Sequence, residues 1–421
     1  MNVIFLTMGR MDITQRGLYN DLMRKFRDCG HKVYIVTPCE RRENKPTSLS
    51  ETEGVCTLRV RTLNVQKTNI VEKGIGQVSI EYLYKRAIKK YLGDVTFDLI
   101  LYSTPPITFP KVIEYLKKKN PAAKTYLMLK DIFPQNAVDL GMLVDRLTVK
   151  GERLKGVVNL GKYQLYKMFR RKEKRLYALS DYIGCMSPAN VRYVTEHNPE
   201  VNPEKVEVCP NSIELGKELS AEEERARDYV ERDYMCSKYN IPKELPLFIY
   251  GGNLGRPQGI DYLIKCLDAI KERKDCYFIV VGNGTEYEKL AAWYHENRNC
   301  NVRLMERLPK DDYDMLVRAC DVGLIFLDHR FTIPNYPSRL LSYLASKKPV
   351  ICATDNHTDI GKIAEENGYG YWCESVKPED FTTLVDKMLA ADRKEMGEKG
   401  YEFLKKNYSV ENTYGAIMRH F

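Results

Sequence analysis

The sequence predicts an α/β protein built from two Rossmann-like, doubly wound parallel-sheet domains. The chain has 421 residues, which exceeds the usual size of a single hydrophobic core. Short apolar runs alternate with helical patterns, which is typical of parallel sheets covered by helices on both faces. This alternating series occurs twice, before and after a polar, charged segment over about residues 202–246 that we interpret as the connection between the domains.

The first series opens with a strand over residues 2–6, a helix over 17–30 that ends in glycine, and a strand over 32–38. The apolar runs are short and continuous, as expected for strands buried on both faces. The same alternation continues through a strand, a helix and two further strands: 98–106, 109–119, 124–131 and 181–187. We expect residues 1–210 to form the N-terminal domain.

The second series begins with a strand and glycine turn over residues 245–255, followed by a helix over 258–273. Further strands and helices follow in order: 276–284, a helix from 285, 301–309, 311–319, 321–328, 348–355 and 368–373. We expect a C-terminal domain over residues 211–395 and a helix over 396–421 that packs back towards the first domain. Because tandem parallel sheets bind ligands at the carboxyl ends of their strands, we expect a cleft between the domains.

Composition and motif spacing restrict the class of protein. The sequence is 43% hydrophobic and 29% charged, which is ordinary for a globular chain. No run approaches the ~18 apolar residues of a membrane span, and MNVIFLTMGRMD lacks the features of a secretory signal. The twelve cysteines form no CxxC pair and the six histidines show no ligand spacing. We therefore expect reduced thiols in the cytoplasm, no metal and no cofactor.

The positive charge is concentrated in one segment. Residues 150–177 contain ten Lys or Arg against two Glu, while the whole chain has a net charge of +9. Within residues 148–179, apolar residues fall close to one helical stripe, namely Leu165, Phe169, Leu176 and Leu179 with Met168 beside it. Such a helix can rest on an anionic membrane, and residues 80–92 have a similar mixture. The alternative is a core-facing helix with a solvated basic back; nothing resembles a nucleic-acid recognition motif.

Four ordered segments of the second half are IYGGNLGRPQGIDYLIKCLDAI, IVVGNGTEYEKL, RLPKDDYDMLVRACDVGLIFLD and PNYPSRLLSYLASKKPVICATD. They resemble the donor half of retaining GT-B glycosyltransferases of glycosyltransferase family 4. In the first half, YSTPP and LKDIFPQNAVDLGML resemble the members that build bacterial capsular polysaccharides and exopolysaccharides. The resemblance implies sugar transfer with retention from a nucleotide-diphosphate sugar, by family habit a UDP-sugar. The implied acceptor is a polyprenyl-diphosphate-linked glycan at the inner face of the plasma membrane. The resemblance also implies that residues 1–210 bind the acceptor and residues 211–395 bind the donor.

A diphosphate donor needs backbone N–H groups and cations where charge develops. The resemblance assigns these to the turn GGNLGRPQG, with five candidates: Gly252, Asn253, Gly255, Arg256 and Gln258. The commoner family pattern has Arg and Lys where this chain has Asn253 and Gln258. Two further segments are implied to approach the nucleotide and its base: Gly282 and Gly284, then Arg307, Leu308 and Pro309. For the two glycine segments the alternative is an ordinary glycine turn. For residues 307–309 the alternative is a plain loop that leads into a helix whose N-cap could be Asp311.

The stretch FTIPNYPSRLLSYLASKKPVI lacks a carboxylate. Family members usually carry a Glu-x7-Glu pair here, and the aligned positions are Pro334 and Ser342. The remaining chemistry is that of an anion site, because Arg339 opens a helix. The donor candidates of this stretch are Pro334, Asn335, Tyr336, Pro337, Ser338, Arg339 and Ser342. The alternative is that Arg339 is a solvated helix charge.

Asp131, at the end of a predicted strand, is the candidate catalytic residue that orients the acceptor hydroxyl or acts as a base. The alternative is that it caps the following helix or turn. The loop TMGRMDITQRG offers acceptor-binding candidates Gly9, Arg10, Asp12, Arg16 and Gly17. Two rival functions remain. A nucleotide-sugar epimerase would need a cluster of acids and histidines; a catalytically inactive relative would act as a binding partner in a polysaccharide assembly complex. The sugar, the linkage and the oligomeric state stay open.

Overall fold

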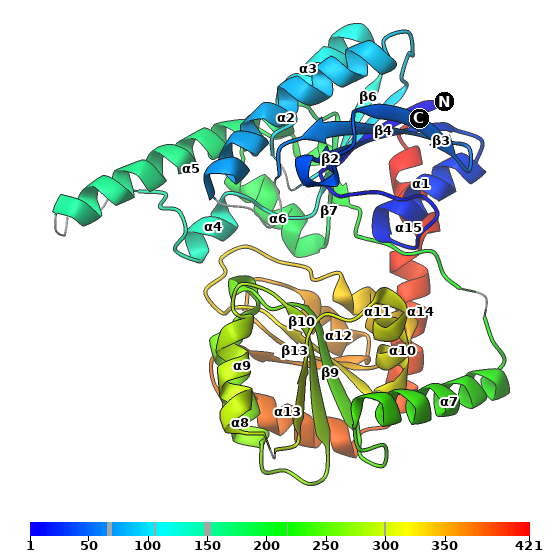
Figure 1. The fold of residues 1–421 in the computed structure, drawn as a ribbon, viewed down its shortest axis with the longest axis vertical. Coiled ribbons are helices and arrows are strands. Elements are labelled where there is room, and N and C mark those ends of the chain that lie inside the picture. Colours follow the sequence, from blue (N-terminus) through cyan, green and yellow to red (C-terminus); the bar gives the residue numbers. More distant parts are fainter. Residues whose placement is uncertain (65–69, 105–106, 147–152, 217, 299) are drawn as a thin grey trace. The chain divides into compact units, whose positions relative to one another are not determined.

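The computed structural model describes residues 1–64, 70–104, 107–146, 153–216, 218–298 and 300–421. For residues 70–78 and 153–157 the structure describes the backbone alone. The chain divides into two compact units, each with its own sheet (Figure 1). The first unit comprises Met1–Glu214 and Val410–Phe421, and the second comprises Leu215–Ser409. Two parallel-sheet α/β domains are what the alternating pattern predicts, so the fold class is confirmed.

The first unit contains an eight-stranded sheet of order β3-β4-β2-β1-β5-β6-β7-β8. Its strands are β1 Asn2–Leu6, β2 Lys32–Glu40, β3 Ser48–Thr52, β4 Val55–Thr62, β5 Leu99–Ser103, β6 Lys124–Leu129, β7 Tyr182–Cys185 and β8 Val206–Val208. Its helices are α1 Leu18–Asp28, α2 Ile70–Tyr91, α3 Pro110–Lys119, α4 Gln135–Asp139, α5 Arg153–Leu179, α6 Pro188–His197 and α15 Val410–Met418. All neighbouring strands are parallel except β3 and β4.

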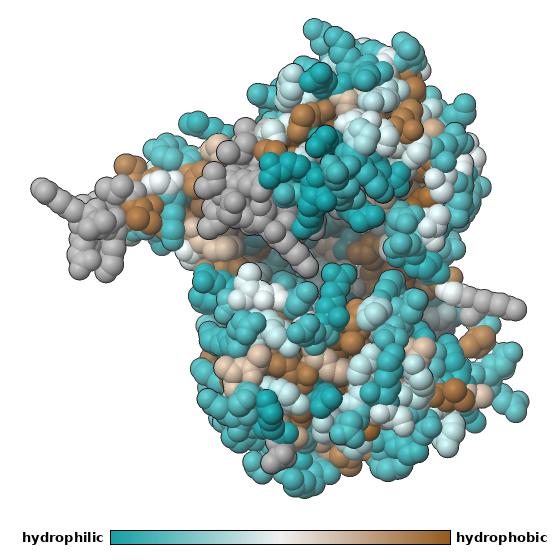
Figure 2. All heavy atoms as spheres, viewed as in Figure 1, coloured by the Kyte–Doolittle hydropathy of each residue, from teal (hydrophilic) through white to brown (hydrophobic). Residues whose placement is uncertain are grey.

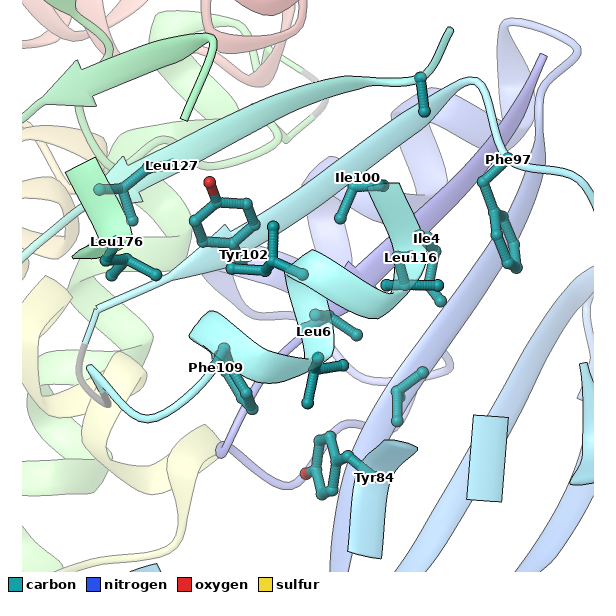
Figure 3. Packing of buried hydrophobic residues seen from close by; sticks show 14 of the residues in the cluster. Ile4, Leu6, Tyr84, Phe97, Ile100, Tyr102, Phe109, Leu116, Leu127 and Leu176 are labelled. Carbon is teal, nitrogen blue, oxygen red and sulfur yellow. The ribbon is translucent and has the colours of Figure 1, made fainter. Parts of the chain in front are cut away.

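The core on one face of this sheet packs strands of the sheet against helices that include α2, α3 and α5. Figure 3 shows side chains of β1, β5 and β6 packed with Tyr84 of α2, Leu116 of α3 and Leu176 of α5, all of which are buried. Burying aliphatic and aromatic side chains in this way is the main favourable term in the stability of the unit. The C-terminal part of α5 is therefore a core element.

The second unit contains a six-stranded, wholly parallel sheet of order β11-β10-β9-β12-β13-β14. Its strands are β9 Leu247–Asn253, β10 Tyr277–Asn283, β11 Val302–Met305, β12 Val322–Phe326, β13 Val350–Thr354 and β14 Gly370–Glu374. Its helices are α7 Ala221–Tyr239, α8 Ile260–Ile270, α9 Tyr287–Glu296, α10 Lys310–Ala319, α11 Arg339–Ala345, α12 Ile360–Glu366, α13 Pro378–Ala390 and α14 Arg393–Tyr408. The strand order reverses between β9 and β12, which is where such sheets bind ligands.

The polar segment over residues 202–246 contains the point where the chain passes from the first unit to the second, and it also contributes an element to each unit. Its first part, β8, is the last strand of the first sheet. Its helix α7 packs on α10 of the second unit, where Arg318 forms a bidentate ion pair with Glu231 (2.6 and 2.7 Å). The high charge of α7 reflects such pairs, because long charged side chains suit a helix that covers a domain surface.

The C-terminal segment contributes to both units. The helix α14 belongs to the second unit, and α15 packs against α1 in the first, so the segment over 396–421 is two helices. The N–H of Val410 donates to the carbonyl of Ile213 (3.0 Å), and the buried Ile417 lies in the same core cluster as Phe26. None of the helices in the described part of the chain is long and apolar enough to cross a bilayer.

Candidate functional site

The glycine turn that follows β9 is held by its own polar groups. The Oε1 atom of Gln258 accepts hydrogen bonds from Nδ2 of Asn253 (3.0 Å) and from the N–H of Gly255 (3.2 Å). Gly252 has φ of +128° and Gly259 has φ of +58°, conformations that side chains with a Cβ rarely adopt. The amide oxygen of Gln258 therefore shapes the turn, which explains why an uncharged residue occupies this position.

The glycines of the GNG motif are required by the neighbouring turn. A Cβ on Gly282 would lie 1.9 Å from the carbonyl oxygen of Gly252, and one on Gly284 would lie 2.3 Å from that of Leu254. These distances leave no room for a side chain. The tight-turn interpretation of GNG thus accounts for both glycines, while their backbone stays beside the glycine turn of β9.

Two arginines near this turn differ in their electrostatic environment. Arg256 is largely exposed and forms an ion pair with Glu286 (3.4 Å). Arg339, the first residue of α11, stacks its guanidinium carbon 4.3 Å from the centroid of the Tyr250 ring. Its Nη1 atom is buried without a hydrogen-bond partner among the described residues. The interpretation of Arg339 as a solvated helix charge is therefore wrong.

Arg339 also faces the turn directly. A Cβ on Gly252 would lie 3.4 Å from the Nη2 atom of Arg339, so the guanidinium lies against the backbone of the turn. Within the described residues no carboxylate forms an ion pair with it. A buried cation without a counter-ion is unfavourable, and an anion at this position would compensate its charge. The Arg339 guanidinium and the N–H groups of the turn together form an arrangement suited to a phosphate group.

The remaining donor candidates between residues 334 and 342 differ in how far packing within the second unit engages their side chains. The hydroxyl of Tyr336 is hydrogen-bonded to that of Tyr408, and the ring is buried inside the unit. The carbonyl of Asn335 accepts a hydrogen bond from the hydroxyl of Thr358. Pro334 is buried, and Pro337 and Ser342 are half-buried. Ser338 is exposed and precedes α11 without a side-chain capping bond. Of these side chains, that of Tyr336 is the most clearly held by contacts within the second unit.

The segment over residues 307–309 precedes α10. Arg307 and Pro309 are exposed and Leu308 is half-buried. Pro309 occupies the N-cap position and α10 begins at Lys310. The expectation that Asp311 caps this helix is therefore wrong, because Asp311 lies inside its first turn. A carboxylate there still interacts favourably with the helix dipole.

Asp131 follows the end of β6 in the first unit. Its N–H and that of Lys130 both donate to the hydroxyl of Thr104, at 3.3 and 2.9 Å. Burial raises the pKa of the Asp131 carboxyl to about 6. The next helix, α4, has Pro134 at its N-cap and no side-chain capping bond, so Asp131 does not cap it. A carboxyl group with a pKa near neutrality suits proton transfer or orientation of a hydroxyl.

The loop over residues 7–17 is largely engaged in contacts of its own. Asp12 accepts hydrogen bonds from the hydroxyl (2.7 Å) and N–H (3.2 Å) of Thr14, and these bonds lower the pKa of Asp12. Arg16 forms ion pairs with Asp21 (3.3 Å) and Glu214 (3.7 Å). Among the candidates, Arg10 is the available cation, because its contact with Glu43 is long (3.7 Å) and its side chain is 78% exposed.

Gly9 and Gly17 serve the same loop through their backbone. The N–H of Gly9 donates to the hydroxyl of Thr7 (3.0 Å), and the N–H of Gly17 donates to Asp21 (2.9 Å). Gly17 precedes α1 as its N-cap residue. The carboxylate of Asp21, which the sequence did not single out, is buried and also accepts the N–H of Glu214 (3.0 Å). Arg16 and Gly17 are therefore parts of a structural network around Asp21.

The basic helix α5 has two parts with different surroundings. Leu176 and Tyr177 are buried, whereas Val158, Leu165 and Met168 are 57%, 46% and 38% exposed. The predicted stripe therefore changes from core to surface along the helix, and Figure 2 shows hydrophobic atoms gathered along α5. Four cations between residues 170 and 175 form ion pairs: Arg170 with Glu173, Lys172 with Glu81, Lys174 with Glu200 and Arg175 with Glu114. Of the predicted segment over 148–179, residues 148–152 lie outside the described residues.

Comparisons with known proteins agree with this architecture. Residues 232–403 match the family Glycosyl transferases group 1. The chain is 23% identical over 381 residues to the probable glycosyltransferase WbjE of Pseudomonas aeruginosa, covering 89% of this chain and 86% of that protein. It is 24% identical over 156 residues to the putative colanic acid biosynthesis glycosyl transferase WcaI of Escherichia coli, covering 36% and 37%.

Solved structures show the same fold at low sequence identity. Sucrose-phosphate synthase from Thermosynechococcus elongatus superposes with a TM-score of 0.73 at 14% identity, covering 100% of this chain and 98% of that one. WaaG, a glycosyltransferase involved in lipopolysaccharide biosynthesis, gives 0.61 at 15% identity with 99% of both chains covered. Anabaena HepE in complex with UDP-glucose gives 0.63 at 11% identity, covering 100% and 99%. Residues 232–403 thus resemble the group 1 glycosyltransferases, and the chain has the GT-B fold of two parallel-sheet α/β domains.

Proposed function

We propose that this protein transfers a sugar, with retention, from a UDP-sugar to a lipid-linked glycan during bacterial surface polysaccharide biosynthesis, as in glycosyltransferase family 4. The observation that carries the proposal is the buried guanidinium of Arg339, which faces the glycine turn of β9 without an acidic partner in the described residues. Relatives named for colanic acid and lipopolysaccharide biosynthesis, and a HepE structure holding UDP-glucose, support the choice of substrates.

The donor diphosphate occupies the space between the glycine turn and Arg339. Backbone N–H groups and the guanidinium stabilise the negative charge that grows on the leaving nucleotide. The acceptor oxygen attacks the anomeric carbon from the face that the nucleotide leaves, and the leaving phosphate oxygen takes the acceptor proton. Asp131 orients the acceptor hydroxyl or assists as the base. No metal is required, because Arg339 and the N–H groups supply the compensating charge.

The acceptor is carried on a polyprenyl diphosphate, and the protein works at the cytoplasmic face of the plasma membrane. The exposed apolar side chains of α5 enter the interface, and nearby cations such as Lys167 and Arg171 attract anionic lipids. Arg10, the available cation of the first loop, suits the acceptor diphosphate. This division assigns the donor to the second unit and the acceptor to the first.

The experiment combines binding with turnover. Purified protein is mixed with UDP-, GDP- and TDP-sugars, with and without a membrane lipid extract, and nucleotide release is measured. We expect release from a UDP-sugar that depends on the lipid extract. Binding of UDP-sugar without release under any condition would favour the second candidate, a catalytically inactive member of an assembly complex. If the protein neither binds any of the three nucleotide-sugars nor releases nucleotide from them, the proposed transferase activity is contradicted.

A further inference from the structure

The strands β9 and β12 separate early at the point where the strand order of the second sheet reverses. The strand β9 pairs with β10 along its whole length, from Leu247 to Asn253. On its other side it pairs with β12 through two positions, which end at the Gly323–Ile249 pair. The backbone groups of β9 beyond this pair need other partners, because unpaired buried N–H and C=O groups are costly.

The hydroxyl of Tyr343 supplies these partners. It accepts the N–H of Gly251 (3.2 Å) and lies within donating distance of the carbonyls of Ile249 (3.1 Å) and Leu324 (3.3 Å). Tyr343 is fully buried, and it comes from α11, one helical turn after Arg339. One hydroxyl thus lies within hydrogen-bonding distance of both strands at the place where their ladder ends.

Two glycines make space for this arrangement. A Cβ on Gly323 would lie 2.4 Å from the ring of Tyr343. A Cβ on Gly251 would lie 2.1 Å from the hydroxyl of Tyr313. Strands in the centre of a parallel sheet usually carry bulky branched residues, so two glycines facing tyrosines indicate a position where rings replace strand side chains.

We propose that Tyr343 is a positioning residue for the donor diphosphate: it holds β9 and β12 apart and sets the Gly251–Gly252 backbone against Arg339. The inference rests on the proposed donor site and adds the residue that shapes it. Because Tyr343 and Arg339 share the short helix α11, the hydroxyl anchors that helix to β9. The anchor keeps the guanidinium stacked on Tyr250, whose own hydroxyl bonds to the carbonyl of Asn253 (2.9 Å). A ring without the hydroxyl fills the same space but leaves the N–H of Gly251 without its partner.

The test compares Tyr343→Phe with Tyr262→Phe. Tyr262 is also buried in the second unit, and its hydroxyl donates to the carbonyl of Lys377 (3.0 Å). Each variant therefore loses one buried hydroxyl that bonds to backbone. UDP affinity is measured by calorimetry, and amide exchange of Gly251 and Gly252 by hydrogen–deuterium exchange. We expect Tyr343→Phe to weaken UDP binding by about tenfold and to speed exchange at these glycines, a scale set by one hydrogen bond. Tyr262→Phe should leave both unchanged.

The outcomes separate the proposal from the function on which it rests. Equal UDP affinity in wild type and Tyr343→Phe overturns the positioning role, and so does an equal loss in both variants. A wild-type protein that binds no UDP overturns the donor assignment itself, and the positioning role with it. If Tyr343→Phe does not fold, amide hydrogen exchange of the wild-type protein tests the positioning role. Slow exchange of the Gly251 amide, which lies beyond the β9–β12 ladder, supports the role, and fast exchange overturns it.

Discussion

Two arginines lie close to the same glycine turn, yet their surroundings assign them different chemistry. The charge of Arg256 is compensated by Glu286 in contact with solvent. That of Arg339 is buried against Tyr250 without an acidic partner in the described part of the chain. Exposed ion pairs contribute little, whereas a buried cation interacts strongly with an incoming anion. The distinction depends on side-chain packing, so the sequence could identify both candidates but could not rank them.

The first prediction concerns this ranking. Arg339→Ala should weaken UDP binding by about tenfold to a hundredfold, because a hydrogen bond to a charged group contributes about 1.5–3 kcal/mol. Arg256→Ala and Ser342→Ala should each have an effect of a few-fold at most. Calorimetric titration of the three variants with UDP measures this order. Equal and negligible effects across the three would contradict the phosphate assignment.

The second prediction concerns the Asp131 carboxyl, whose pKa burial raises to about 6. The folded state holds this proton at pH values where the unfolded chain has released it. Ionised Asp131 is therefore unfavourable in the fold, and its contribution to stability falls as pH rises from about 4 through about 6. Asp131→Asn should gain stability relative to wild type over this interval, by about 1–3 kcal/mol. Denaturant unfolding of both proteins at pH 4.5 and 7.5 measures the difference.

The same carboxyl should control turnover. If ionised Asp131 assists the acceptor, wild-type kcat/KM rises as pH increases through about 6, and Asp131→Asn loses both this rise and most of its activity. The pH profile of nucleotide release measures it. If Asp131→Asn has the same pH profile as the wild type, the leaving phosphate alone takes the acceptor proton and Asp131 does not act as the base.

At the level of elements, α5 shows how one amphipathic pattern can serve two environments. The stripe through Leu165 and Leu176 is continuous in sequence, and its helical period is correctly predicted. The helix nevertheless buries Leu176 in the core and exposes Leu165. Periodicity defines which residues share a face, but the neighbours of that face are determined by long-range packing. The core-facing alternative therefore holds for the part of the helix around Leu176, and membrane contact of the exposed part stays a prediction.

The third prediction tests the exposed part of α5. The double variant Leu165→Gln, Met168→Gln should reduce binding to phosphatidylglycerol vesicles by about tenfold or more, because each side chain loses apolar burial worth about 1 kcal/mol or more. The matched control is Tyr229→Gln, Val230→Gln on α7, whose side chains are 73% and 63% exposed. Vesicle sedimentation measures both. Equal binding by the two variants would contradict a membrane role for α5.

Local sequence patterns predict the strands and turns better than they predict the side-chain contacts of the candidate site. The apolar runs of β9 and β10 and the glycines between them and their helices were all recognised. The strand β3 is absent from the prediction because Ser48–Thr52 is polar and largely exposed, and β4 is absent because arginines and threonines interrupt its apolar residues. The side chain of Tyr336 was expected at the donor, but it bonds to Tyr408, more than seventy positions away. Contacts between distant residues leave no local signal of this kind.

For the whole molecule, the division into two units predicts separate unfolding behaviour. Ile417 is buried in the first unit, although the long segment that precedes its helix, Leu215–Ser409, forms the second unit. The fourth prediction is that Ile417→Ala costs about 2–5 kcal/mol and lowers the stability of the first unit alone. Ile270→Ala, which removes a buried side chain from α8, should lower that of the second. Calorimetry with limited proteolysis identifies which unit unfolds. A loss shared by both units in either variant would contradict independent cores.

The return of Val410–Phe421 to the first unit has a consequence for biosynthesis. This segment is translated after the entire second unit, Leu215–Ser409. At about 5–20 residues per second, roughly ten to forty seconds separate Glu214 from Val410 on the ribosome. During that interval the surface that α15 later covers, including Phe26 of α1, has no partner. The second unit can complete its core before the first, so the order of maturation in this chain runs opposite to the order of its sheets.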